Sequence, residues 1–150
     1  MNLRQRFAEL LQIITKNIPE REYHVQLGFL TTLIQEPFYL YGRPGCGTSL
    51  IIRRISNAFK DAKVLRLGKQ QKQLPDNTND FNQIIFDNFT PSDEQIKSNL
   101  QIAIHDHGKK SIIISGNQKP ESALSRSEVT DQVTLTIMLP ETISSDALCT

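Results

Sequence analysis

Five short apolar runs, which alternate with segments of helical periodicity, constrain the fold of this chain more than any other feature. The runs are Phe38–Tyr41, Val64–Leu67, Gln83–Asp87, Ser111–Ser115 and Val133–Leu139. Sequences such as IIFD and IIIS are almost continuously apolar, which is typical of strands covered by helices on both faces. Strands that alternate with helices predict an α/β fold with a parallel sheet.

Helical spacing of apolar residues is clearest before the first run. Two amphipathic helices are expected there, with the stripes Phe7, Leu10, Leu11 and Ile14 and, after Pro19, Tyr23, Leu27, Leu30 and Ile34. Each stripe predicts the buried face of its helix. Between the third and fourth runs, Thr90 and Pro91 predict a helix start, because Thr is a good N-cap and Pro is favoured at the first helical position.

The length of 150 residues suits one domain with a sizeable core. We expect this core over residues 1–140, with the N-terminal helices of residues 1–36 included, followed by a C-terminal tail over residues 141–150. No apolar run approaches the ~18 residues of a membrane span. Two cysteines, Cys46 and Cys149, form no disulfide framework. A cytoplasmic protein without a membrane partner is therefore expected.

Charge is distributed unevenly along the chain. Residues 1–72 hold 12 Lys and Arg against 5 Asp and Glu, whereas residues 73–150 hold 5 against 11. This asymmetry suggests head-to-tail self-association or an acidic partner, and the plain alternative is a mixed solvated surface. The basic half would suit a nucleic acid, but no aromatic and basic stacking pattern supports one.

A glycine-rich turn, GRPGCGTS, follows the first run and precedes a helical segment. It has the spacing of the phosphate-binding loop GxxxxGK[ST], with Thr48 in the place of the lysine. Backbone N–H groups and a helix N-terminus surround phosphate oxygens in such a loop, and the lysine adds a point charge. The candidate nucleotide-binding residues of this loop are Gly42, Gly45, Cys46, Gly47, Thr48 and Ser49. The alternative is a Gly/Pro turn that binds no ligand.

Polar residues follow the third and fourth runs, where ligand sites of parallel sheets lie. Asp87 ends an apolar run in the manner of a Walker B segment and is a candidate magnesium ligand together with Ser49. Asn88 stands where a water-activating glutamate is expected, and an amide has no useful basicity. Asn117 is a candidate contact for a γ-phosphate or the attacking water. The alternatives are a strand-end cap for Asp87 and a turn residue for Asn117.

Together these motifs resemble the nucleotide-binding core of the MoxR/RavA branch of AAA+ ATPases. The resemblance extends over about residues 15–140 and is specific around Tyr39–Phe59. It implies a three-layer P-loop NTPase fold with five parallel strands in the order 5-1-4-3-2, and ATP or ADP with Mg²⁺ as the ligand. The segment SIIISGNQKPESALSRSE also resembles the DnaA/Hda-type clade.

Several positions depart from the family pattern. The resemblance places Asp131 and Gln132 where an Asp-Arg pair would supply an arginine finger, and Arg126 is the nearest upstream arginine. Ser49 and Asp87 are only 38 positions apart, so the usual insertion between the Walker segments is expected to be absent or trimmed. A helical lid domain after the fifth run is not expected.

These departures predict a degenerate AAA+ module that does not hydrolyse ATP. It would bind nucleotide weakly or not at all and act as an adaptor or assembly subunit, through a protein partner or AAA+-type self-association. Two alternatives remain: an active MoxR-type ATPase in which Arg43 or Lys119 replaces the lysine, and a DnaA/Hda-like module associated with nucleic acid.

Overall fold

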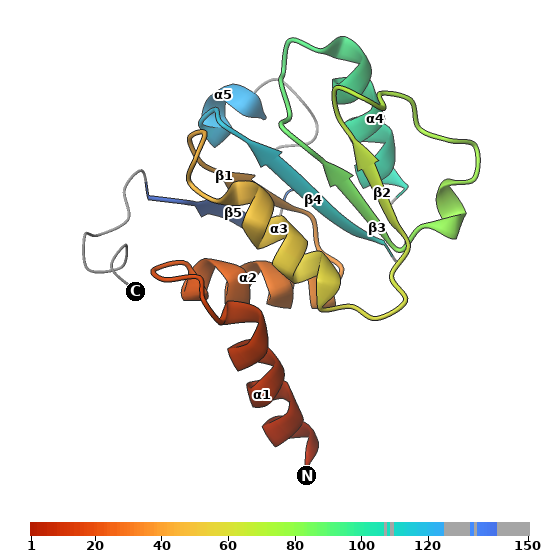
Figure 1. The fold of residues 1–150 in the computed structure, drawn as a ribbon. Coiled ribbons are helices and arrows are strands. Elements are labelled where there is room, and N and C mark those ends of the chain that lie inside the picture. Colours follow the sequence, from red (N-terminus) through yellow and green to blue (C-terminus); the bar gives the residue numbers. More distant parts are fainter. Residues whose placement is uncertain (107, 109, 125–132, 134, 141–150) are drawn as a thin grey trace.

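A computed structural model describes residues 1–106, 108, 110–124, 133 and 135–140. A five-stranded sheet lies at its centre, with helices on both faces (Figure 1). The strands are β1 (Phe38–Tyr41), β2 (Val64–Leu67), β3 (Gln83–Phe86), β4 (Ser111–Gly116) and β5 (Leu135–Met138). Their order is β2-β3-β4-β1-β5 and every neighbouring pair is parallel. The predicted α/β class and the order 5-1-4-3-2 are confirmed.

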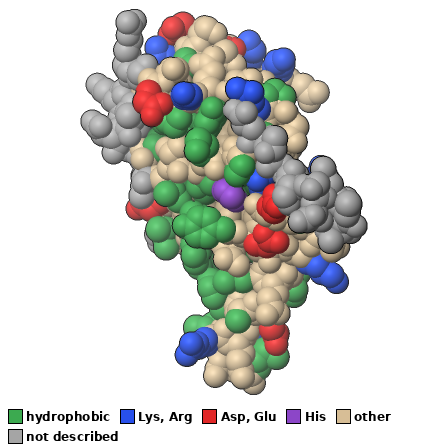
Figure 2. Space-filling view, turned by 90° about the vertical axis from the view of Figure 1, so that its left-hand side faces the viewer, with side chains coloured by type: hydrophobic (Ala, Val, Ile, Leu, Met, Phe, Trp, Pro, Cys, Tyr) green, Lys and Arg blue, Asp and Glu red, His purple; other side chains and the backbone are tan. Residues whose placement is uncertain are grey.

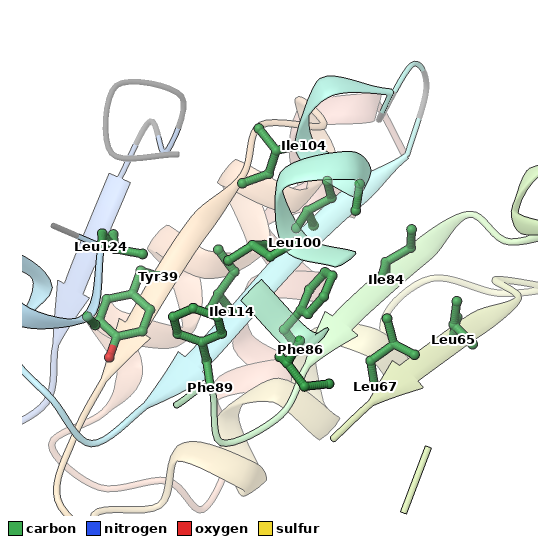
Figure 3. Packing of buried hydrophobic residues seen from close by; sticks show 14 residues of the cluster. Tyr39, Leu65, Leu67, Ile84, Phe86, Phe89, Leu100, Ile104, Ile114 and Leu124 are labelled. Carbon is green, nitrogen blue, oxygen red and sulfur yellow. The ribbon is translucent and has the colours of Figure 1, made fainter. Parts of the chain in front are cut away.

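Alternate residues of the strands lie on opposite faces of the sheet and belong to two separate hydrophobic cores. One face of the sheet is covered by the helices α1 (Leu3–Thr15), α2 (Glu22–Leu33) and α3 (Thr48–Asn57). These helices pack against strand residues such as Phe38 and Ile113. On the other face lie α4 (Glu94–His105) and α5 (Pro120–Ala123). Figure 3 shows this second core, in which Phe86, Ile114 and Leu100 meet. A short 3-10 helix, η1 (Thr78–Asp80), precedes β3.

The first helix, α1, follows the predicted pattern and extends away from the sheet (Figure 1). A capping box begins it, because the amide of Gln5 donates to the Asn2 side chain at 2.9 Å and the Gln5 side chain accepts from the Asn2 amide at 3.1 Å. Its predicted stripe packs against the core, with Ile14 buried and Phe7 partly buried. The stripe is therefore confirmed.

The predicted buried face of α2 is wrong except at Leu27, which is partly buried against the core. Tyr23 and Ile34 are 66% and 65% exposed, and the residues facing the core are instead Val25, Gly28, Phe29, Thr31 and Thr32. Two features of the buried face explain the error. Gly28 lets α2 approach α3 closely, since an added Cβ would lie 2.5 Å from Ile55. The Thr32 hydroxyl donates to the Gly28 carbonyl at 2.7 Å, so a polar side chain is satisfied inside the core.

The outer face of α2 contributes to a surface rich in apolar side chains. Besides Tyr23 and Ile34, Leu30 and Leu33 are exposed on this helix. Hydrophobic side chains gather on the face shown in Figure 2 and continue down onto the narrow end that α1 forms. Among the described helices, none is long and apolar enough to cross a membrane.

The predicted start of α4 is also wrong. The helix begins at Glu94, and its N-cap is Asp93, whose carboxylate accepts the Ile96 amide at 3.2 Å. Thr90 belongs instead to a turn, in which its carbonyl accepts the Asp93 amide at 3.0 Å. The last run also forms a shorter strand than expected, because β5 begins at Leu135.

Candidate functional site

The loop between β1 and α3 has the backbone conformation that its glycines allow. Gly45 and Gly47 both have a φ of +88°, a region that side chains with a Cβ rarely adopt. Gly42 is buried against Leu139 and Thr48, and its amide donates to the Gly116 carbonyl at 3.1 Å. The local geometry therefore requires glycine at each of the three positions of the motif, by backbone conformation at Gly45 and Gly47 and by close packing at Gly42.

Gly47 is also the N-cap of α3, so the loop delivers a helix N-terminus. The first helical hydrogen bond is donated by Ile51 to the Gly47 carbonyl at 3.0 Å. The amides of Thr48, Ser49 and Leu50 precede that bond, and such amides lack an acceptor within their own helix. Together with the helix dipole they favour a bound anion.

A pocket of about 510 Å³ lies in front of this helix N-terminus. Its lining comes from three strand ends and consists of Gly42, Arg43, Pro44, Gly45, Gly47, Thr48, Ser49, Leu50, Asp87, Asn88, Ser115, Gly116 and Asn117. The pocket therefore brings together all but one of the candidate site residues predicted from the sequence. Because β4 lies between β1 and β3, the order of the strands produces this convergence.

The exception is Cys46, which is not among the described residues that line the pocket. Its side chain is 5% exposed and belongs to the core beneath the loop, where Ile51 and Ile52 also lie. Its carbonyl accepts a hydrogen bond at 3.3 Å from Nε of Arg21, which is itself buried. The carbonyl of Cys46 thus links the loop to Arg21, and its side chain packs in the core.

Asp87 is held at the end of β3 by neighbours on both sides. Its amide donates to the Leu67 carbonyl at 2.8 Å, and its Oδ1 accepts the Ser115 hydroxyl at 3.1 Å. Arg66 Nη1 lies 4.0 Å from its other oxygen, in a half-exposed ion pair. The carboxylate is therefore oriented before any ligand binds.

Ser115 is a site residue that the sequence reasoning missed. It is buried, and its hydroxyl oxygen both donates to Asp87 and accepts the Asn88 amide at 3.0 Å. Its carbonyl accepts the Phe89 amide at 2.7 Å. Asn88 has a φ of +53°, so these bonds hold a left-handed turn directly after Asp87. A polar residue at the end of the run IIIS was the available signal.

The charged groups of the site differ in their placement. Arg43 lines the pocket, whereas Lys119 is the N-cap residue of α5 and is not among the described residues of the lining. Thr48, which stands in the place of the lysine, lines the pocket, and its hydroxyl lies beside Gly42. The candidate arginine-finger positions Arg126, Asp131 and Gln132 lie outside the described residues, as do Cys149 and the predicted tail.

No protein-family model matches the sequence. The fold is similar to that of a protein from Cytophaga hutchinsonii described as a candidate ATPase, with a TM-score of 0.69 and 13% identity. That match covers 97% of this chain and 54% of the other. The fold of this chain is also similar to that of AMPPCP-bound DnaA from Aquifex aeolicus, with a TM-score of 0.62 and 11% identity. This second match covers 87% of this chain and 48% of DnaA. This chain thus spans about half the length of either protein.

These likenesses show that this chain shares its α/β fold with both proteins. At such low identity they concern the fold alone. The placement of the glycine loop, Asp87 and Asn117 at the carboxyl edge of the sheet comes from this chain's own residues.

Proposed function

We propose that this chain is a degenerate AAA+ module of the MoxR/RavA branch, which binds a nucleotide weakly through loop 42–49 and does not hydrolyse ATP. The single observation that carries the proposal is the pocket itself. Loop amides, a helix N-terminus, Asp87 and Asn117 converge there, while Thr48 and Asn88 stand where charged catalytic groups are expected.

The chain's own groups support phosphate binding better than chemistry. The loop amides can donate to phosphate oxygens, and Asn117 lines the same pocket with an amide group that can donate to the outermost phosphate. Ser49 and Asp87 offer a hydroxyl and a carboxylate, and these oxygen ligands fit Mg²⁺, which keeps much of its water shell. When bound, the metal would neutralise phosphate charge. Asn88 cannot accept a proton from water, so hydrolysis would lack a base.

The proposed cellular role is that of an adaptor or assembly subunit with a protein partner or further copies of the chain. The exposed apolar residues of α2 support this role, because contiguous apolar surface is typical of protein contact sites.

The decisive variant is Thr48→Lys, studied by calorimetric titration with ATP and ADP, with and without Mg²⁺. We expect nucleotide affinity to increase by about tenfold, the scale of one charge-assisted hydrogen bond. Phosphate release should stay at the blank level. The matched control is Ser98→Lys, which adds the same charge on an exposed position of α4, away from the pocket lining. Unchanged titrations of a folded Thr48→Lys protein would contradict nucleotide binding by the loop.

Arg43 favours a second candidate function, an active ATPase with atypical residues. It lines the pocket and would supply a positive charge close to the phosphates. This candidate requires magnesium-dependent phosphate release by the wild-type protein that Asp87→Asn abolishes. Absence of turnover in both proteins would exclude it.

A further inference from the structure

The turn that carries Asn117 is fastened to β1 by a buried tyrosine. Tyr39 is fully buried, and its hydroxyl donates to the Gln118 carbonyl at 2.7 Å. Figure 3 shows its ring in the core beside Ile114 and Leu124, in the same cluster as these residues. Burial raises the pKa of Tyr39 to about 12, so the hydroxyl keeps its proton and remains a donor at neutral pH.

Gly116 shows how closely this turn approaches the tyrosine. A Cβ built on Gly116 would overlap the Tyr39 hydroxyl and lie 3.1 Å from two ring carbons. The carbonyl of Gly116 accepts the amide of Gly42 at 3.1 Å. Both residues that flank Asn117 are therefore anchored to β1 or to the loop that follows it.

Tyr39 does not line the pocket among the described residues, whereas Asn117 does. The contacts of the tyrosine with Gly116 and Gln118 link it to the two residues that flank Asn117. The Asn117 side chain is exposed, and its direction depends on how its two neighbours are held. Removing one hydroxyl would free the Gln118 carbonyl, which belongs to an exposed residue where water can replace the lost donor.

We propose that Tyr39 is a positioning residue that holds Asn117 toward the phosphate loop and so sets the preference of the site for a nucleoside triphosphate over a diphosphate. This rests on the proposed function, because it requires that phosphates bind at loop 42–49. The outermost phosphate is the group that differs between the two ligands. Asn117 directly follows β4, the strand next to β1, and lines the same pocket as the loop.

A double-mutant cycle separates this role from a general effect on folding. The variants are Tyr39→Phe, Asn117→Ala and the combination, with dissociation constants for ATP and ADP measured by calorimetry in Mg²⁺. We expect Tyr39→Phe to lower the ATP-to-ADP preference by about three- to tenfold, the scale of one hydrogen bond, with ADP affinity unchanged. Asn117→Ala should lower the preference by a similar factor. The double variant should show no further loss, because both changes remove the same contact, that of Asn117 with the outermost phosphate.

Tyr41→Phe is the matched control. It removes a hydroxyl from a partly buried tyrosine on the same strand, two residues from Tyr39 and outside the described lining of the pocket. The preference for ATP should not change in this variant. Equal preference in wild type and Tyr39→Phe, or additive losses in the double variant, would overturn the inference.

The two proposals fail in different ways. A wild-type protein that binds ATP and ADP equally well overturns the role of Tyr39 and leaves nucleotide binding intact. A wild-type protein that binds neither overturns the proposed function and the selectivity with it. In that case, amide hydrogen exchange at residues 117–119 still tests whether Tyr39 anchors the turn. Exchange should be faster in Tyr39→Phe than in wild type or Tyr41→Phe, and equal rates would refute the anchor.

Discussion

Asp93 shows how one side chain can fix the position of a helix. Its carboxylate caps α4 and also accepts a hydrogen bond from Lys72 Nζ at 2.7 Å. The Lys72 hydrogen bond, with help from the Ile96 amide, holds the pKa of Asp93 below its ordinary value of 3.8. Two residues far apart in the sequence are thereby joined at the start of the helix.

This contact predicts a pH-dependent difference in thermal stability. A carboxyl whose folded pKa is depressed stabilises the fold above its unfolded pKa, and that contribution is lost as the pH falls through the folded value. Asp93→Asn keeps a capping side chain but removes the charge. We expect it to have a lower Tm than wild type at pH 7, and the two to converge as the pH falls below about 4. A constant difference down to pH 2 would contradict this.

Single residues also mark where sequence reasoning reached its limit at the site. The glycines of loop 42–49 were identifiable because their spacing is local and their backbone conformation requires them. Ser115 and Tyr39 act through partners 27 and 79 positions away, which no local pattern reveals. The burial of the Cys46 side chain was not fixed by the sequence pattern, because a loop position alone does not say which side of the loop faces the core.

At the level of elements, the strands were predictable and the orientation of α2 was not. The strands are short, nearly continuous apolar runs, and parallel strands buried on both faces require this pattern. In contrast, α2 is apolar on two sides. Most of the regular stripe with Tyr23 is exposed. The face with Phe29 lies inside, because a glycine and threonines that bond to their own helix permit close packing there.

The observed orientation of α2 can be tested with two aromatic residues of the same helix. Phe29 is 2% exposed, and its ring centroid lies 5.9 Å from that of Phe7 and 5.3 Å from that of Phe59. Phe29→Ala should lower the free energy of unfolding by about 3–5 kcal/mol, because it leaves a cavity. Tyr23→Ala removes an exposed ring and should change it by less than about 1 kcal/mol. Chemical denaturation measures both changes. A larger loss of stability in Tyr23→Ala than in Phe29→Ala would support the buried stripe that was predicted from the sequence.

At the scale of the whole molecule, the candidate site lies at the carboxyl edge of the sheet. The carboxyl edge gathers the pocket, and the order of the strands alone brings the ends of β1, β3 and β4 together there. The strand order was expected from the family resemblance, and right-handed crossovers then place helices on both faces of the sheet. The finer fit of the pocket depends on side chains from strands that are neighbours only after folding.

The outward course of α1 has a consequence for how the intact chain resists a protease. Only Ile14 of this helix is fully buried, and the exposed Lys16 follows in an extended conformation, before Asn17 with a φ of +60°. Segments with little buried surface open most easily, and cleavage selects them. Trypsin at low concentration should therefore cut first after Lys16, and mass spectrometry should find a stable fragment that begins at Asn17. An early cut after Arg53 or Arg54, in the middle of α3, would show instead that α1 is held as firmly as the helix behind the phosphate loop.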